Sequence, residues 1–360
     1  MDRVLNFAAG PAAIPVEVLE SIKQNVCNYE GAGLSVMEMS HRSKTYEKII
    51  NETRDNLKKI LNLSDDFEIL FLQGGASLQF AMVSLNLANK GDTTLYAVTG
   101  NFASKAWDEA KRWTNAVDIT NSKADKYKFI PEIDNAKIDS SAKYLHITAN
   151  NTIFGTMYDK LPEVNVPLVA DVSSNVLGKD YDYNKFALAY AGAQKNLGPA
   201  GLTVVIVNKK FIREDLDKEV PTMLRYDTHA KNGSMYNTPP TFAIYVAGEM
   251  FKWVMKEGGV KAIEKRNIEK AKILYDILDN SPFYKPFADK NSRSIMNVTF
   301  NLPSEELEAK FIEEAKNKGM INLKGHRVLG GIRASIYNAM TLDGVKTLAE
   351  FMQTFETQNK

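Results

Sequence analysis

Cysteine, long apolar runs and an excess of charge of one sign are all scarce in this sequence of 360 residues. A single cysteine, Cys27, excludes an internal disulfide framework and any metal site built from several cysteines. The 45 basic and 44 acidic residues leave a net charge of +1, so no broad field would attract nucleic acid or a membrane. No segment approaches the roughly 18 apolar residues of a membrane span, and the first residues do not resemble a signal peptide. We therefore expect a cytoplasmic protein that acts on small molecules, with no metal, nucleic acid or membrane partner.

Internal repeats and low-complexity tracts are also lacking, and the remaining pattern alternates strands with helices. Apolar runs rich in β-branched and aromatic residues lie at 67–72, 93–98, 142–148, 166–172, 186–192 and 202–207. Helical spacing of apolar residues separates the first three runs, which is typical of βαβ units around a parallel sheet. Before them, Pro15 is expected to begin one helix, and Ser43 to cap a second at 43–61.

The pattern changes after residue 239. Two long helices are expected at 241–257 and 260–280, interrupted at Gly258 and Gly259. A strand at 294–302, a helix at 304–318, a strand at 332–338 and a closing helix from Leu342 follow. This order predicts a second unit of α+β type with its own small sheet.

Two charged residues stand where strands of the first unit are expected to end. Lys195 follows the run at 186–192 and precedes the turn NLGPAG, and Asp171 closes the segment VPLVAD. Ligands of open α/β sheets bind at such strand ends, and a partly desolvated lysine can form a Schiff base with a carbonyl. A pyridoxal-phosphate enzyme needs this lysine together with a carboxylate for the pyridine nitrogen. Taken singly, the two residues could equally be solvated charges at the rim of the sheet.

The segment LQGGASLQF at 72–80 follows a strand and precedes a helix. Gly74 and Gly75 allow close backbone approach, while Ala76 and Ser77 offer amide hydrogens and a hydroxyl at a helix N-terminus, where phosphate is favoured. The segment matches neither a Walker loop nor a G-x-G-x-x-G fingerprint. By itself it could also be a tight turn between a strand and a helix.

Eight blocks, in order along the chain, carry a resemblance to a known family. They are NFAAGPAAIPVEVL, MEMSHRSKTYE, QGGASLQF, NNTIFGT, ADVSSN, GAQKNLGPAG, YNTPPTFAIY and LKGHRVLGGIRASIYNAM. The sequence resembles the class V aminotransferases of pyridoxal-phosphate fold type I and, within them, the phosphoserine aminotransferase family. The resemblance implies an α/β fold, with a large domain whose mainly parallel seven-stranded sheet lies between helices and a smaller α+β C-terminal domain. It places an N-terminal segment at 1–15 against the small domain, the large domain at 16–258 and the small domain at 259–360.

The resemblance also implies pyridoxal 5'-phosphate as the cofactor, with Lys195 as the catalytic residue that binds it and moves the substrate Cα proton. Asp171 would hold the pyridine nitrogen, and Thr152 would bond the ring oxygen. The other cofactor-binding positions that it implies are Gly75, Ala76, Ser77, Phe102, Ser173, Gln194, Asn237 and Thr238. The last two would come from a neighbouring subunit, which implies a homodimer. Many members carry tryptophan where this chain has Phe102, which can stack with less area and no N–H donor.

The substrates implied are L-glutamate and 3-phosphohydroxypyruvate, converted to 2-oxoglutarate and O-phospho-L-serine in L-serine biosynthesis. The pairs His41–Arg42 and His326–Arg327 would bind the phosphate or the distal carboxylate, and Arg333 the α-carboxylate, because guanidinium groups bind such anions bidentately. A related step of pyridoxine biosynthesis, on 4-phosphohydroxythreonine, is left open by the sequence.

Two histidines and the cysteine are assigned no role of this kind. His146 is expected in the interior and His229 in a loop. Cys27, on the first predicted helix, is expected to be buried and inert. Two other functions are weighed: a cysteine desulfurase, which would need Cys27 near the substrate, and a binding module for phosphorylated metabolites without catalysis.

Overall fold

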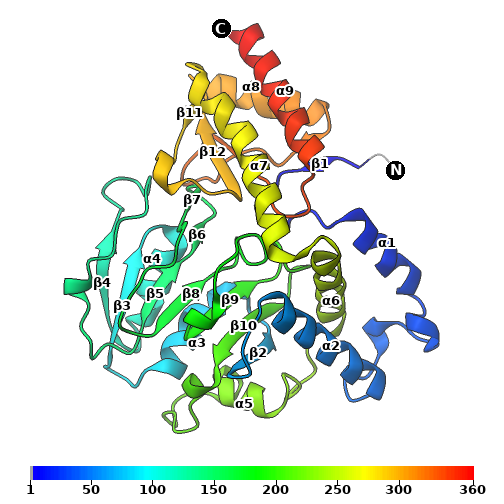
Figure 1. The fold of residues 1–360 in the computed structure, drawn as a ribbon, viewed down its shortest axis with the longest axis vertical. Coiled ribbons are helices and arrows are strands. Elements are labelled where there is room, and N and C mark those ends of the chain that lie inside the picture. The colour runs from blue at the N-terminus through cyan, green and yellow to red at the C-terminus, as the bar shows by residue number, and fades with distance from the viewer. Residues whose placement is uncertain (1–2) are drawn as a thin grey trace.

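The computed structural model describes residues 3–360, in which a seven-stranded sheet lies beneath a smaller three-stranded sheet (Figure 1). The large sheet runs in the order β2 (Phe67–Leu72), β10 (Thr203–Asn208), β9 (Leu188–Gly192), β8 (Leu168–Asp171), β5 (Leu145–Thr148), β3 (Thr93–Val98) and β4 (Asn115–Asn121). Only β10 is antiparallel to its neighbours. The predicted α/β fold with a mainly parallel seven-stranded sheet is confirmed. The sequence did not predict β4, because this edge strand is half exposed and carries no apolar run.

Helices cover both faces of the large sheet. Ile69 and Phe71 of β2 belong to one hydrophobic cluster, with residues of α2 (Lys44–Ile60) and α6 (Thr241–Lys256). Leu70 and Leu72 belong to another, with residues of α3 (Gly75–Leu87) and α4 (Asn101–Ala110). Successive strand side chains point to opposite faces, so β2, β3, β8, β9 and β10 contribute to both clusters. These strands are therefore buried on both sides, which explains their nearly continuous apolar sequences.

The helix starts predicted for the N-terminal part are confirmed. Helix α1 (Val16–Asn25) begins directly after Pro15, and the Ser43 hydroxyl accepts a hydrogen bond from the Tyr46 amide at the start of α2. The placement of Cys27 was wrong, because α1 ends at Asn25 and Cys27 is exposed beyond it. The Asn25 side-chain amide donates to the Ser21 carbonyl oxygen, and its Oδ1 accepts a hydrogen bond from the Glu30 amide. These two bonds give partners to backbone groups at the end of the helix and just beyond it.

The two histidines without an assigned role are both buried. His146 lies in β5, as predicted, 1% exposed. His229 was expected in a loop, but it lies in the short helix α5 (Tyr226–Lys231), with a ring nitrogen 2.9 Å from the Met223 carbonyl oxygen. A helix of six residues is too short for its apolar period to show in the sequence.

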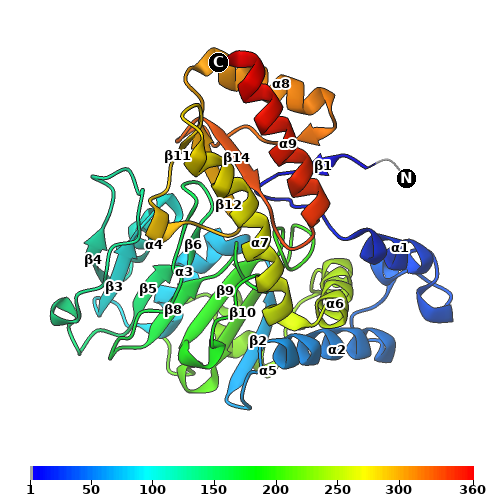
Figure 2. The ribbon, with the colours of Figure 1, turned by 45° about the horizontal axis from the view of Figure 1, so that its top comes forward.

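The C-terminal part contains the predicted small sheet, formed by β11 (Lys285–Pro286), β12 (Asn297–Asn301) and β14 (Ile332–Ser335). Helices α7 (Gly259–Asn280), α8 (Glu305–Asn317) and α9 (Leu342–Asn359) surround it (Figure 2). Strand β1 (Leu5–Asn6) pairs in parallel with β13 (Met320–Ile321). The next residue, Phe7, is buried in the hydrophobic cluster that the small sheet forms with α7, α8 and α9. The predicted division of the chain into segments 1–15, 16–258 and 259–360 stays a prediction. Residues 1–2 of the N-terminal segment lie outside the described residues.

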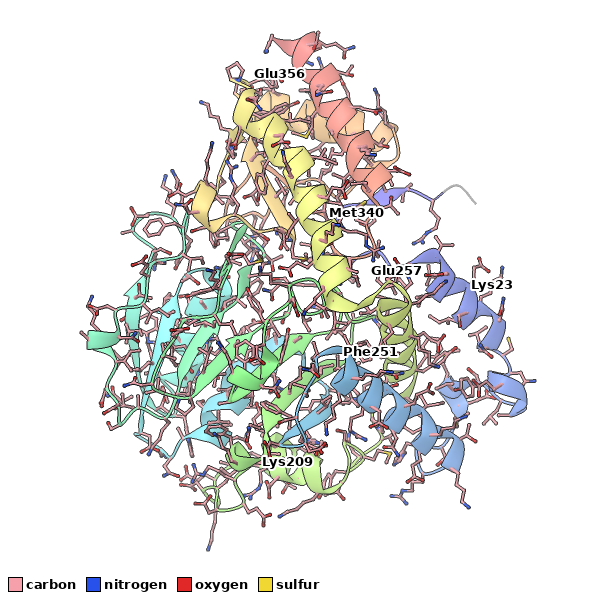
Figure 3. All side chains as sticks on the ribbon, viewed as in Figure 1. Lys23, Lys209, Phe251, Glu257, Met340 and Glu356 are labelled. Carbon is pink, nitrogen blue, oxygen red and sulfur yellow. The ribbon has the colours of Figure 1, made fainter. Side chains whose placement is uncertain are left out.

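Helix α7 links the two parts of the molecule. It begins after Gly258, which has a left-handed backbone, and Figure 3 shows Glu257 where α6 gives way to α7. Val260 and Ile263 near its start pack in the hydrophobic cluster that contains Ile69 and Phe71 of the large sheet. Leu274, further along the helix, belongs to the hydrophobic cluster of the small sheet. Within residues 3–360, none of the helices combines the length and the apolar character needed to cross a membrane.

A buried lysine of α7 fixes the turn between β14 and α9. The Lys270 Nζ donates to the carbonyl oxygens of Ile336, Tyr337 and Met340 at 2.9, 2.8 and 2.9 Å. Burial lowers the pKa of Lys270 to about 7. A neutral amine has only two N–H bonds, so three carbonyl acceptors favour the ammonium form. This ion holds the chain that follows β14 against α7.

We expect K270M to lower the free energy of unfolding by about 2 to 4 kcal/mol, because it leaves three buried carbonyl groups without a donor. Urea unfolding followed by circular dichroism measures the loss. The matched control is K272M, since Lys272 on the same helix is exposed and pairs with Asp276; its effect should stay within about 0.5 kcal/mol. Equal losses in both variants would contradict this role for Lys270.

Candidate active site

The carboxyl ends of β2, β3, β5, β8 and β9 meet around one cavity of about 320 Å³. Ligands bind at this edge in open α/β sheets. The small sheet and the N-terminal segment complete the walls. The predicted site residues that line the cavity are Gly75, Ala76, Ser77, Phe102, Thr152, Asp171, Ser173, Gln194, Lys195, His326 and Arg333.

The remaining predicted site residues lie outside this cavity. His41 and Arg42 form a turn before α2, where Arg42 is exposed. Asn237 lines a smaller neighbouring cavity together with Gln73 and Gly74, and Thr238 and Arg327 are exposed. Of the predicted basic residues, the cavity therefore contains Lys195, His326 and Arg333. It does not contain His41, Arg42 or Arg327.

The amine of Lys195 lies inside the cavity and is bound by Thr152. Its Nζ donates to the Thr152 Oγ1 at 2.7 Å. Burial lowers the pKa of Lys195 to about 8; Asp171 opposes this shift and Arg333 adds to it. At pH 7 about one such amine in ten is neutral, against roughly one in 3,000 at the ordinary lysine pKa. Lys195 is therefore prepared to act as a nucleophile.

The carboxylate of Asp171 is buried at the end of β8. The Ser173 amide donates to its Oδ1 at 2.9 Å, and the Ser173 hydroxyl accepts from the Gly192 amide at 3.1 Å. Burial raises the pKa of Asp171, while the bonds from Ser173 and the charge of Lys195 lower it. The site thus offers a fixed carboxylate oxygen to a cationic nitrogen.

The N-terminus of α3 forms another wall. Gly74 caps the helix with a φ of 91°, in the left-handed region that favours glycine. The Leu78 amide bonds the Gly74 carbonyl, so the amides of Gly75, Ala76 and Ser77 belong to the first turn, where helix amides have no intrahelical acceptor. No acidic side chain occupies this turn. Free amides and the positive end of the helix dipole together suit a phosphate group.

The opposite wall carries two basic side chains from the small sheet and its loop. Arg333 lies on β14, its Nε is buried without a partner among residues 3–360, and burial lowers its pKa. The Val328 amide donates to the His326 Nδ1 at 3.2 Å, so the other ring nitrogen carries the proton in neutral His326. Burial and the charges of Arg333 and Arg327 lower the pKa of His326. Both residues have donors left for an anionic ligand.

Several lining residues were assigned no role from the sequence. They are Ala9, Gly10, Phe80, Thr148, Asn150, Ile153 and Ser174. The N-terminal segment is held there because the Ala12 amide donates to the Gln194 carbonyl at 2.8 Å, and the Tyr337 hydroxyl donates to the Ala9 carbonyl at 2.9 Å. The block NFAAGPA was a signal for this segment, but contacts between the two ends of a chain do not follow from a local pattern.

Neither a metal centre nor a reactive thiol appears at the site. Among residues 3–360, no group of three or more His, Cys, Asp or Glu side chains could hold a metal ion. Cys27 does not line the cavity, so it offers no sulfur nucleophile to a ligand bound beside Lys195.

Comparisons with known proteins show which family the chain resembles. Residues 4–348 match the family model described as aminotransferase class-V. A phosphoserine aminotransferase of Bacillus cereus is 48% identical over 361 residues, which cover 100% of both chains. The solved phosphoserine aminotransferase of Bacillus circulans subsp. alkalophilus has a TM-score of 0.96 and 44% identity, and covers 100% of each chain. A pyridoxal-phosphate-bound phosphoserine aminotransferase from Trichomonas vaginalis has a TM-score of 0.91 and 35% identity, and covers 98% of this chain and 100% of its own.

The lowered pKa predicts how the reactivity of Lys195 depends on pH. Labelling with a small aromatic aldehyde, trapped by cyanoborohydride and quantified by peptide mass spectrometry, should rise with pH through an inflection at about pH 8, because only the neutral amine attacks. In D171N the inflection should move to lower pH, since the carboxylate that raises the pKa is gone. Exposed Lys23, which projects from α1 in Figure 3, calibrates the reagent in the same digest. An unchanged inflection in D171N would contradict this electrostatic account.

Proposed function

The chain belongs to the class-V aminotransferase family, and from this membership and the geometry of the site we propose the following function. It catalyses the reversible transfer of the amino group of L-glutamate to 3-phosphohydroxypyruvate, which gives O-phospho-L-serine and 2-oxoglutarate in L-serine biosynthesis. The observation that carries the proposal is the buried Lys195 amine, which shares a cavity with Asp171, the α3 N-terminus and Arg333. The step of pyridoxine biosynthesis stays a prediction.

The residues present fit pyridoxal 5'-phosphate. This group would supply an aldehyde and an electron-withdrawing ring that carries the amino group from one substrate to the next. Lys195 would bind the aldehyde carbon, and Asp171 would hold a proton on the ring nitrogen. The amides of Gly75 to Ser77 and the side chain of Gln194 would bind the phosphate. Phe102 would stack on the ring.

The protein groups then perform the acid–base work. The Lys195 amine would remove the proton from the substrate Cα when an amino group is given up, and would return a proton to Cα when an amino group is received. A lysine of pKa about 8 is suited to this role, because it exchanges protons near neutral pH. The Thr152 hydroxyl, 2.7 Å from the Lys195 Nζ, keeps the amine in the cavity between these events.

Substrate recognition would rest on the small sheet. Arg333 would bind the α-carboxylate that both substrates share, because it lines the cavity and its buried Nε has no protein partner among residues 3–360. His326 and Arg327 would face the group at the other end, a phosphate in one substrate and a carboxylate in the other.

We further infer a homodimer whose sites are shared. His41, Arg42, Asn237 and Thr238 lie outside the cavity of their own chain, although the resemblance assigns them to the site. A second copy of the chain would supply them if these segments reach across a two-fold interface.

Replacing Lys195 by alanine should abolish turnover, with a loss of at least about 10³-fold, because both the covalent attachment and the proton transfer are removed. The measurement is a coupled assay of 2-oxoglutarate formed from glutamate with 3-phosphohydroxypyruvate and, in parallel, with pyruvate. K195A should still bind inorganic phosphate as the wild type does. Turnover in K195A, or equal use of pyruvate and the phosphorylated keto acid by the wild type, would contradict the proposal.

A mixed dimer tests whether the sites are shared. K195A and R42A homodimers should each lose most activity. In a K195A/R42A heterodimer purified with two tags, one site combines both defects and the other has neither, if Arg42 acts across the interface. That heterodimer should therefore recover about half of the wild-type activity. An inactive heterodimer would show that Arg42 acts within its own chain.

A further inference from the structure

Lys105 lies one turn after Phe102 on α4 and has no assigned role. Phe102 lines the cavity from the first turn of α4, and Lys105 follows on the same face of the helix. The Lys105 Nζ lies 5.7 Å from the centroid of the Phe102 ring. The Lys195 Nζ lies 5.7 Å from the same centroid. Two ammonium groups therefore lie near the ring that is expected to stack on the cofactor, and one of them, that of Lys105, has no proposed catalytic role.

Contacts at the start of α4 fix the backbone from which Lys105 projects. Gly100 caps this helix and lies so close to the Asn151 side chain that a Cβ at Gly100 would collide with it. The Asn151 amide donates to the Thr99 hydroxyl at 3.2 Å, which ties the end of β3 to the hairpin of β6 (Asn150–Asn151) and β7 (Thr156–Met157). The first turn of α4 is thus fixed to the segment that carries Thr152.

The other basic side chains of this region are neutralised by neighbours, and Lys105 is not. Lys111 pairs with Asp108 at 2.9 Å, and Arg112 pairs with Glu109 at 3.2 Å. Lys105 is exposed and makes no ion pair with any residue of 3–360. Its charge is also the smallest of the four causes that lower the pKa of His326, which lines the cavity. An unpaired cation near His326 adds to the positive charge available to an anionic ligand.

We propose that Lys105 is a specificity-determining residue that binds the distal anionic group of the substrate, above all the phosphate, at the mouth of the cavity. The inference rests on the proposed function. His326 and Arg333 both line the cavity and are partly exposed, whereas Arg327 and Lys105 are exposed. The phosphate, proposed to face His326 and Arg327, is therefore the substrate group within reach of an exposed lysine on α4. A phosphate dianion carries more charge than the distal carboxylate of glutamate, and its binding should depend more strongly on Lys105.

The test uses the holoenzyme with K105M, K105R and K111M. In K105M, the KM for 3-phosphohydroxypyruvate should rise about 3- to 10-fold, as expected for one charge-assisted contact, while the KM for glutamate changes less than about 2-fold. The kcat should change by less than about 2-fold. K105R retains the charge and should behave like the wild type. K111M removes the same charge from the end of the same helix, where Asp108 already neutralises it, and is the matched control.

A second measurement does not depend on turnover. Inorganic phosphate titrated into the holoenzyme by calorimetry should bind more weakly to K105M than to K111M, by a similar factor. Added salt should reduce the difference, because screening weakens an exposed contact. If the wild type turns over but K105M and K111M have equal KM values and phosphate affinities, the inference fails while the proposed function stands. A wild type that does not turn over refutes the proposed function itself.

Discussion

The site depends on the balance between burial and the charge of Asp171 at the Lys195 amine. Burial favours the neutral amine, and the carboxylate favours the ammonium ion; together they bring the pKa of Lys195 to about 8. The Ser173 amide also contributes to this balance, because its hydrogen bond to Asp171 stabilises the carboxylate independently of the lysine. Without burial the amine would stay protonated, and without the carboxylate the cavity would offer no fixed negative charge to the ring nitrogen of the proposed cofactor. The other features of the fold serve to hold these two groups in one cavity.

The reversed strand β10 explains how the lysine is held. Because β10 pairs antiparallel with β9, the chain between them is a closed connection at the carboxyl edge of the sheet. Gly192 and Thr203 are register partners at its base, and the Ala193 amide donates to the Leu202 carbonyl at 3.0 Å. An entirely parallel sheet would send the chain from β9 into a long crossover. The hairpin-like return keeps Lys195 opposite Asp171 on the neighbouring strand β8.

The sequence predicted the parts of this site that lie next to strand ends, and it missed the parts built by distant segments. Lys195 and Asp171 follow apolar runs, so their place at one edge of the sheet could be inferred from the pattern alone. Strand β4 was missed because an edge strand needs no apolar run. The approach of Ala9 to the cavity depends on the Tyr337 hydroxyl, more than 300 residues away, and no local period encodes such a contact. Arg333 was assigned through resemblance, since its own segment predicted only a strand.

The charge of the whole chain is nearly zero, and the selectivity of the site must therefore be local. Asp171 is the one acidic side chain among the described residues that line the cavity, whereas Lys195, His326 and Arg333 are basic. At physiological ionic strength charges are screened beyond about 8 Å, so distant surface residues contribute little to binding. A partly buried guanidinium whose Nε has no partner among the described residues is costly in the free protein, and an anionic ligand would remove that cost. The unpaired Arg333 Nε therefore favours a ligand that carries a carboxylate, in keeping with the substrates proposed above.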